Sequence, residues 1–266
     1  MPREKARPSV RWRFWLTALA WCAVFVSSAL AARQARRFVL TDPQFVLSGE
    51  QRGAVTVQGA VYASRAKLLR VFAFDYGRSI FAVPLAERRR RLLAVDWVED
   101  ASVSRIWPDR LLVRVTERKP VAFVSLPVHA GSGAPARFLL VDPQGVLLDP
   151  PLRALFAFPV LTGLTEDQTE PERRVRVRAM MRLLEELGPM GQNISEINAA
   201  APDDLTVVAQ VEGRMLELQL GDGNYARRMQ HFLLHYSEIH QQALNTTTFD
   251  LRLDDRITAK EPQKKP

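Results

Sequence analysis

The chain has 266 residues, 47% of them hydrophobic and 25% charged, with a formal net charge of +8 and one cysteine, Cys22. A chain of this length commonly forms two domains, and a lone cysteine excludes a disulfide within the chain. Residues 1–37 contain eight Lys or Arg and one Glu, so they carry nearly all of the excess positive charge. A nucleic-acid-binding domain needs its surplus charge clustered on a folded surface, so this distribution argues against nucleic acid as a partner.

Residues 14–32 form a stretch of 19 residues without a charge. About 20 apolar residues span the hydrocarbon core of a bilayer, so the stretch predicts a transmembrane helix. Five Lys or Arg precede it and three follow it. The positive-inside rule then places residues 1–13 in the cytoplasm as a short tail, with the rest of the chain outside. The alternative is a cleaved signal peptide with an A-x-A site at Ala29-Leu30-Ala31. The stretch is longer than the usual h-region of about 7–15 residues, which favours a retained helix.

Residues 45–118 have the pattern of a small α+β domain. Val55-Thr56-Val57 predicts a short strand, and Ser64 is a candidate N-cap for a helix that runs to Phe72. A second helix is expected from Pro84, because a proline at the first helical position loses no hydrogen bond.

Two strands follow these predicted helices. Residues 100–105 alternate with period two, the Trp107-Pro108 turn comes next, and residues 111–116 alternate again. The predicted order is β-α-α-β-β, a small sheet covered by two helices. The run Arg88–Arg91 on the second helix is interpreted as a solvated face, and contact with anionic lipid headgroups is the alternative.

Residues 119–258 predict a second, β-rich domain with two helices, and residues 259–266 predict a flexible tail. Thr169 and Glu172 form a capping-box pattern ahead of the first helix, and Asn224 is a candidate cap for the second. The buried stripe expected on the first helix is Val177, Met180, Met181, Leu184 and Leu187. The expected strands are 138–141 and 146–148 around an Asp-Pro-Gln-Gly turn, 205–211 and 214–220 around Glu-Gly, and 247–253.

No arrangement of residues predicts catalysis, and no cofactor is expected. His231, His235 and Glu238 recur at i, i+4 and i+7 on one helix, a spacing that a zinc site can use. They lack the H-E-x-x-H pattern and lie opposite Phe232 and Tyr236, so a solvated helix face is the preferred interpretation. The chain is therefore predicted to bind other proteins and not to be an enzyme, with no metal and no small-molecule substrate. A secreted metal-dependent enzyme is the alternative from another class.

Several short motifs together carry a resemblance that runs through nearly the whole chain. They are Val57-Gln58-Gly59, Asp96-Trp97-Val98, Arg105-Ile106-Trp107-Pro108 and Glu117-Arg118-Lys119-Pro120-Val121-Ala122 in the first domain, and Asp142-Pro143-Gln144-Gly145, Phe158-Pro159-Val160-Leu161-Thr162-Gly163 and Phe249-Asp250-Leu251-Arg252 in the second. With these motifs and its apolar N-terminal segment, the chain resembles the FtsQ/DivIB family of bacterial cell division proteins. The resemblance implies a single transmembrane helix, a POTRA-like domain at 45–118 and an FtsQ-type β domain at 119–258, an α+β fold class.

The same resemblance implies a function in assembly. Proteins of this family lie in the inner membrane at the division septum, with a cytoplasmic N-terminus and periplasmic domains. They bind FtsB- and FtsL-type division proteins, and the POTRA domain contacts other divisome proteins, so that early and late components are linked during septum formation. A POTRA-type chaperone of an envelope secretion system, which binds extended client strands, is the alternative function.

The site expected from these considerations is the C-terminal strand. Unpaired backbone groups at a sheet edge recruit further strands. The pattern of residues 247–256 alone favours an ordinary core strand with a solvated end, whereas the resemblance favours a partner-binding edge. The resemblance implies that an FtsB segment adds beside this strand. The residues implicated in partner binding are Phe249, Leu251, Arg252, Leu253, Asp254, Asp255 and Arg256.

Overall fold

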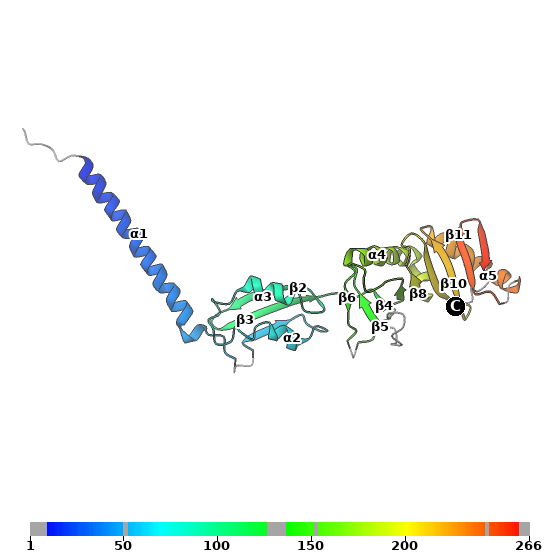
Figure 1. Cartoon of the computed structure of the whole chain (residues 1–266), viewed down its shortest axis with the longest axis horizontal. Helices are drawn as coiled ribbons and strands as arrows, with labels where there is room; N and C mark the ends of the chain where they lie inside the picture. Colours follow the sequence, from blue (N-terminus) through cyan, green and yellow to red (C-terminus); the bar gives the residue numbers. More distant parts are fainter. Residues whose placement is uncertain (1–9, 50–52, 127–136, 152–153, 243–244, 261–266) are drawn as a thin grey trace, which may run out of the picture. The chain divides into compact units, whose positions relative to one another are not determined.

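The computed structural model describes residues 10–49, 53–126, 137–151, 154–242 and 245–260 (Figure 1). The chain divides into two compact units, Met1–Glu117 and Arg118–Pro266. Each unit has its own sheet: one of three strands in the first and one of nine strands in the second. Together with an apolar N-terminal helix, this arrangement confirms the predicted α+β fold class.

The N-terminal helix α1 spans Val10–Thr41 and is longer than the uncharged stretch that predicted it. Its 32 residues correspond to a length of about 48 Å. The segment Phe14–Thr41 is long and apolar enough to cross a membrane, and none of its most apolar window is buried in the protein. The helix ends where Asp42, placed before Pro43, adopts an extended conformation with ψ 129°. A proline disfavours helical backbone in the preceding residue, which explains this end point.

The first unit has the predicted β-α-α-β-β order after a short 3-10 turn, η1 (Pro43–Phe45). Its elements are β1 (Val55–Gln58), α2 (Arg65–Arg70), α3 (Leu85–Leu92), β2 (Val98–Ile106) and β3 (Arg110–Glu117). The strand order is β1-β3-β2, with β1 parallel and β2 antiparallel to the central strand β3. The Ser64 hydroxyl accepts a hydrogen bond from the Lys67 backbone N–H, so the predicted N-cap is confirmed.

The predicted solvated face at Arg88–Arg91 is wrong for Arg88. This guanidinium is 5% exposed and binds the fully buried Asp75 through two hydrogen bonds, of 2.6 Å from Nε and 2.8 Å from Nη2. A buried cation needs a partner of opposite charge, and the paired geometry supplies it. Arg89 is also engaged, because its Nε donates to the Ala101 carbonyl at 2.7 Å and its Nη2 to Asp100 at 2.6 Å.

The last residue of the first unit is fixed at the surface of the unit. The carboxylate of Glu117 accepts hydrogen bonds from the backbone N–H groups of Val61, Tyr62 and Ala63, at 2.8, 2.8 and 2.6 Å to Oε1. These three donors precede α2, so the contact joins the C-terminal end of β3 to the segment that follows β1.

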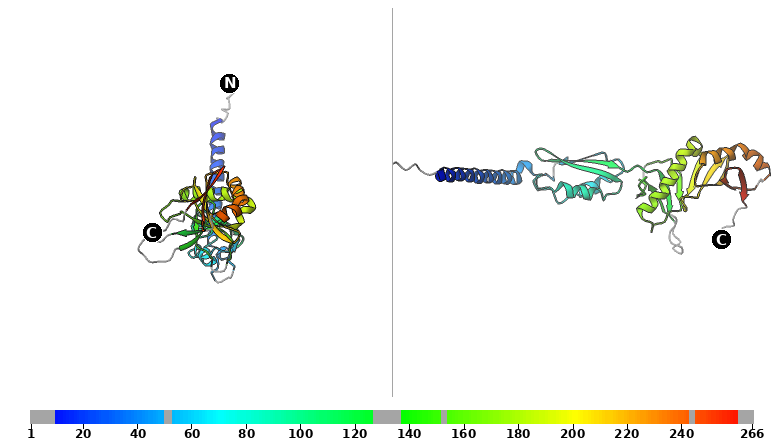
Figure 2. Two further views of the ribbon diagram at one scale, coloured as in Figure 1. Left: turned by 90° about the vertical axis from the view of Figure 1, so that its right-hand side faces the viewer. Right: turned by 90° about the horizontal axis from the view of Figure 1, so that it is seen from above.

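The second unit is built on a nine-stranded mixed sheet with the order β12-β11-β10-β9-β8-β7-β4-β5-β6. Its helices α4 and α5 contact each other and lie alongside the strands (Figure 2). The elements are β4 (Ala122–Leu126), β5 (Arg137–Val141), β6 (Leu147–Leu148), β7 (Val160–Thr162), α4 (Glu170–Leu187), η2 (Gly188–Asn193), β8 (Ile194–Asn198), β9 (Leu205–Val211), β10 (Arg214–Gly221), α5 (Tyr225–Gln242), β11 (Thr248–Leu253) and β12 (Arg256–Lys260).

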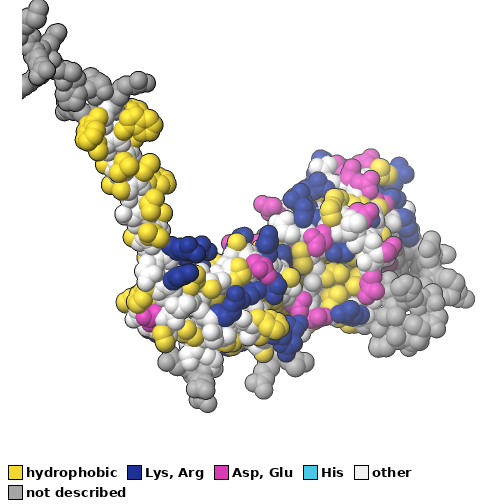
Figure 3. Space-filling view, turned by 60° about the vertical axis from the view of Figure 1, so that its left-hand side comes forward, with side chains coloured by type: hydrophobic (Ala, Val, Ile, Leu, Met, Phe, Trp, Pro, Cys, Tyr) yellow, Lys and Arg dark blue, Asp and Glu magenta, His cyan; other side chains and the backbone are white. Residues whose placement is uncertain are grey.

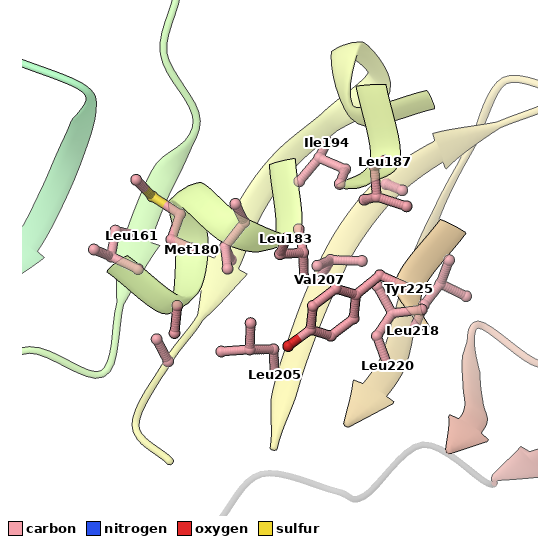
Figure 4. Packing of buried hydrophobic residues seen from close by; sticks show 14 of the residues in the cluster. Leu161, Met180, Leu183, Leu187, Ile194, Leu205, Val207, Leu218, Leu220 and Tyr225 are labelled. Atoms are coloured by element: carbon pink, nitrogen blue, oxygen red, sulfur yellow. The ribbon is translucent and has the colours of Figure 1, made fainter. Parts of the chain in front are cut away.

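One hydrophobic cluster joins these two helices to the sheet (Figure 4). Met180 and Leu187 of α4 belong to it as predicted, but Met181 is 37% exposed and Leu183 takes the inward position. The predicted capping box at the start of α4 is confirmed, since the Thr169 backbone N–H donates to Glu172 at 2.7 Å.

Candidate partner-binding edge

The C-terminal end of the second unit is a strand pair at one margin of the nine-stranded sheet. β11 pairs in parallel with β10 on one side and antiparallel with β12 on the other. The prediction that 247–253 is the last strand is therefore wrong, and of the predicted edge 247–256 only Arg256 belongs to the margin strand β12. Ala259 and Lys260, which the sequence placed in a flexible tail, belong to β12. Residues 261–266 lie outside the described residues.

The structure divides the predicted site residues between the core and the surface. Phe249 and Leu251 are 1% and 2% exposed, and the Phe249 ring lies 5.1 Å from that of Phe232. Their side chains therefore hold β11 on α5 and are not accessible to a partner. The residues with accessible side chains are Arg252, Leu253, Asp255 and Arg256, while Asp254 is half-buried in the turn between β11 and β12.

A network of charges ties β12 to β11. Asp250 of β11 accepts hydrogen bonds from Arg252 at 2.9 and 2.7 Å, and it forms an ion pair of 3.0 Å with Lys260 of β12. Arg252 also reaches Asp204 at 3.2 Å. The hydrogen bonds from Arg252 are the main reason that the pKa of Asp250 lies well below the ordinary value for an aspartate, because they favour its charged form.

Asp250→Asn is expected to lower the thermal stability of the second unit at pH 7 and to reduce its acid sensitivity. A carboxylate with a lowered pKa contributes its stability above the unfolded value of about 3.9. That contribution is lost as the pH falls through the folded pKa. Calorimetry should therefore show a constant difference in Tm between parent and variant from about pH 7 to 5, and a shrinking difference below about pH 4. A difference that stays constant into strong acid would contradict this account.

The turn between the two strands is held by a second set of polar contacts. Arg228 of α5 donates to Asp254 at 2.8 Å and to the Leu220 carbonyl at 2.6 Å, and Asn224 donates to Asp254 at 3.1 Å. The contact with Arg228 also lowers the pKa of Asp254. Asn224 was predicted as a helix cap; it has a positive φ of 53°, and its side-chain amide nitrogen binds this turn. The ends of β10, β11 and α5 are thus fixed around Asp254.

β12 is the better candidate for strand addition among the sheet margins of the two units. The opposite margin of its sheet is β6, which has two residues, whereas β12 has five. In the first unit, the margin strand β1 has four residues, and the longer margin strand β2 already has its Ala101 carbonyl occupied by Arg89. The side chains of Arg256, Thr258 and Ala259 on β12 are exposed. Exposed edge strands present backbone donors and acceptors to a further strand.

The histidine-containing face of α5 does not assemble a metal site. The rings of His231 and His235 lie 4.9 Å apart, and His235 Nδ1 is 3.9 Å from Glu238. Among the residues that the structure describes, no group of three or more His, Cys, Asp or Glu side chains is placed to hold a metal ion.

Comparison with protein families places these features in context. The model of the FtsQ-type POTRA domain matches residues 53–118, which span the β-α-α-β-β elements of the first unit. This match covers the segment in which Trp107-Pro108 joins β2 to β3 and Glu117 ends β3.

Relatives with the name "Cell division protein FtsQ" match across both units. The protein from Koribacter versatilis is 36% identical over 214 residues, covering 78% of this chain and 59% of the relative. The protein from Rhodothermus marinus is 30% identical over 217 residues, covering 78% of this chain and 76% of the relative. The protein from Novosphingobium aromaticivorans is 27% identical over 248 residues, covering 92% of this chain and 70% of the relative. The chain thus spans between 59% and 76% of the length of these three proteins.

Proposed function

Because this chain belongs to the FtsQ family of bacterial cell division proteins, we propose that it is a membrane-anchored divisome protein that binds an FtsB-type strand along β12. The observation that supports this proposal most directly is the five-residue edge strand, held to the core by Asp250, Lys260 and Asp254. Because β11 is paired on both sides, we propose β12 as the docking strand in its place.

The proposed mechanism is strand addition. Backbone hydrogen bonds from β12 to an extended partner segment supply affinity, and exposed side chains beside the strand supply specificity. The predicted residues with exposed side chains are Leu253, Asp255, Arg256 and Arg252, the last of which also binds Asp250 and Asp204. Phe249 and Leu251 act indirectly, because they fix β11 in the core. Assembly of this kind requires no catalytic residue.

The proposed topology follows from α1. Residues 1–13 lie in the cytoplasm, α1 crosses the inner membrane, and both compact units lie in the periplasm, at the septum during division. This orientation is supported by the excess of Lys and Arg ahead of the apolar stretch. Through the POTRA-type unit the protein contacts other divisome components, and through β12 it recruits the FtsB- and FtsL-type pair, so that early and late proteins are linked.

Binding of the full chain to FtsB- and FtsL-type proteins tests the proposal. The chain is reconstituted in nanodiscs and titrated with the extracytoplasmic part of an FtsB-type protein, alone and with its FtsL-type partner. We expect saturable binding, together with reduced hydrogen exchange in residues 256–260. A scrambled FtsB segment of the same composition is the control. Equal binding of the scrambled segment would favour a chaperone-like activity. Absence of binding by the folded chain, or protection confined to other strands, would overturn the proposal.

A further inference from the structure

A cluster of aromatic rings lies where α1 joins the first unit. Phe45 of η1 is its centre and is 4% exposed. The rings of Phe81 and Trp107 lie 5.4 and 6.1 Å from it, and that of Phe38, near the end of α1, lies at 6.1 Å. With Ile106, which adjoins Trp107, these residues form what we call the membrane-proximal patch. Its members come from three parts of the chain that are far apart in the sequence: residues 38–45, Phe81, and residues 106–107.

Most of this patch faces solvent although its residues are apolar. Trp107 is 68% exposed, Phe38 54%, Phe81 39% and Ile106 38%. Single exposed apolar residues are common on soluble proteins, but three exposed aromatic rings around a buried one, with Ile106 next to Trp107 in the chain, mark a surface that contacts something less polar than water.

The patch is held in place by polar contacts. Arg105 donates to the carbonyls of Ile80 and Val83 at 2.7 and 3.0 Å, and its guanidinium lies 5.9 Å from the centre of the Phe81 ring. The Ser79 hydroxyl donates to the carbonyl of Val39 at 2.9 Å, which ties this segment to the end of α1. The rings are therefore fixed relative to the last turns of the helix.

The position of the patch along α1 matches the headgroup layer. A hydrocarbon core of about 30 Å that begins near Phe14 ends close to residue 33. Phe38 is then about 8 Å further along the helix axis, and the polar layer of one leaflet is roughly 5–8 Å thick. Any tilt of the helix brings the patch closer to the hydrocarbon. Tryptophan is enriched in this layer, where one side of the ring is wet and the other apolar.

The charges around the patch suit the same layer. Arg36 and Arg37 are exposed on α1, and Arg78 and Arg110 are exposed beside the loops that carry the rings. Figure 3 shows dark blue Lys and Arg side chains where the apolar helix meets the first unit. Basic residues close to an anionic leaflet are attracted to its headgroups.

We propose that the membrane-proximal patch is a second membrane contact, in which Trp107, Ile106 and Phe81 rest in the headgroup layer of the leaflet from which α1 emerges and the surrounding arginines bind anionic headgroups. The inference rests on the proposed membrane insertion of α1 but not on partner binding at β12. It makes the first unit a domain that lies against the bilayer at the end formed by the β2–β3 turn.

Spin labels on the full chain test this contact. In a Cys22→Ser background, a label is attached either at Ile106→Cys in the patch or at Val61→Cys. The Val61 backbone N–H binds Glu117, at the far end of β3 from the turn, so the control label lies about 23 Å away along the strand. The chain is reconstituted in nanodiscs that contain phosphatidylglycerol and phosphatidylethanolamine, and collision rates with oxygen and with a water-soluble nickel chelate are measured.

The expected result is a several-fold lower rate of nickel collisions, relative to oxygen, for the label at 106 than for the label at 61. Adding Trp107→Ser should move the label at 106 toward the control value. Equal nickel access at both positions overturns the proposal.

A label on native Cys22 separates this result from the proposed function. Cys22 lies within α1, so oxygen access without nickel access there reports insertion of the helix independently. An inserted helix with a water-exposed label at 106 contradicts the patch alone. If the label at 106 is shielded but the chain does not bind the FtsB-type protein, the result contradicts the proposed function and leaves the membrane-proximal patch supported.

Discussion

Proline at the outward-facing position of β12 is expected to weaken binding of the FtsB-type partner by at least about tenfold without changing the Tm of the free protein. Along an antiparallel strand, consecutive N–H groups point alternately to the paired strand and away from it. Thr258 pairs with Asp250 and Ala259 with Phe249, so one of these two N–H groups faces β11 and the other faces outward. Thr258→Pro and Ala259→Pro are therefore made as a pair and titrated with the partner in nanodiscs.

The two variants control for each other. The variant whose proline removes the outward N–H group should bind the partner more weakly at an unchanged Tm. The variant whose proline removes a hydrogen bond to β11 should have a lower Tm in addition to weaker binding. Thr258→Ala and Ala259→Ser keep both N–H groups and should bind within about twofold of the parent, because only side chains that face solvent change. If both proline variants bind as tightly as the parent, the partner does not add along β12.

Asp75→Ala is expected to destabilise the first unit by about 3–5 kcal/mol, the usual cost of leaving a buried charge without its partner. Arg88, which is 5% exposed in the native packing, would lose both hydrogen bonds to the Asp75 carboxylate and keep only its 3.4 Å contact with the more exposed Glu87. The double variant Asp75→Leu with Arg88→Met removes both charges and should recover more than half of the loss. The free energy of unfolding is measured by urea titration of the full chain in detergent micelles.

Tryptophan fluorescence makes this measurement specific to the first unit. All five tryptophans of the chain precede residue 118, and Trp97 is 4% exposed. Arg91→Ala is the matched control from the same run of arginines. Its ion pair with Glu87 is 2.5 Å long but half exposed, so its loss should cost less than about 1 kcal/mol. A cost for Asp75→Ala no larger than that of the control would show that the buried pair does not stabilise the unit.

Short-range sequence patterns correctly predicted helix caps and a hairpin. The Ser64 cap, the capping box of Thr169 and Glu172, and the hairpin 205–221 are all present, because each depends on residues a few positions apart. The order of the nine-stranded sheet was not predictable in this way. The parallel pairs β10–β11 and β4–β7 join segments separated by a helix or a long connection. The sequence of a strand does not specify which distant strand will pair with it.

The strand that we propose as the docking edge, β12, was not predicted from the sequence. β12 has five residues, only Ile257 and Lys260 of them half-buried, so it lacks the alternation that reveals a strand. Edge strands are often short and polar for this reason, since such features discourage aggregation. The burial of Arg88 and the membrane-proximal patch were not predicted for another reason. Asp75 lies in an irregular segment, and Phe38, Phe45, Phe81 and Trp107 meet only in the folded unit.

The contact of Glu117 with residues 61–63 also has a mechanical consequence. The chain enters the first unit beside Phe45, which contacts Trp107 at the β2–β3 turn, and it leaves at Glu117, at the other end of β3. Tension between α1 and the second unit therefore pulls β3 lengthwise between β1 and β2. Hydrogen bonds that lie across the direction of pull share the load in shear and must break together, unlike those of a strand peeled from an edge. The Glu117 carboxylate reinforces the point where the force leaves the unit. The first unit is thus arranged to resist extension when the chain is pulled at Phe45 and at Glu117.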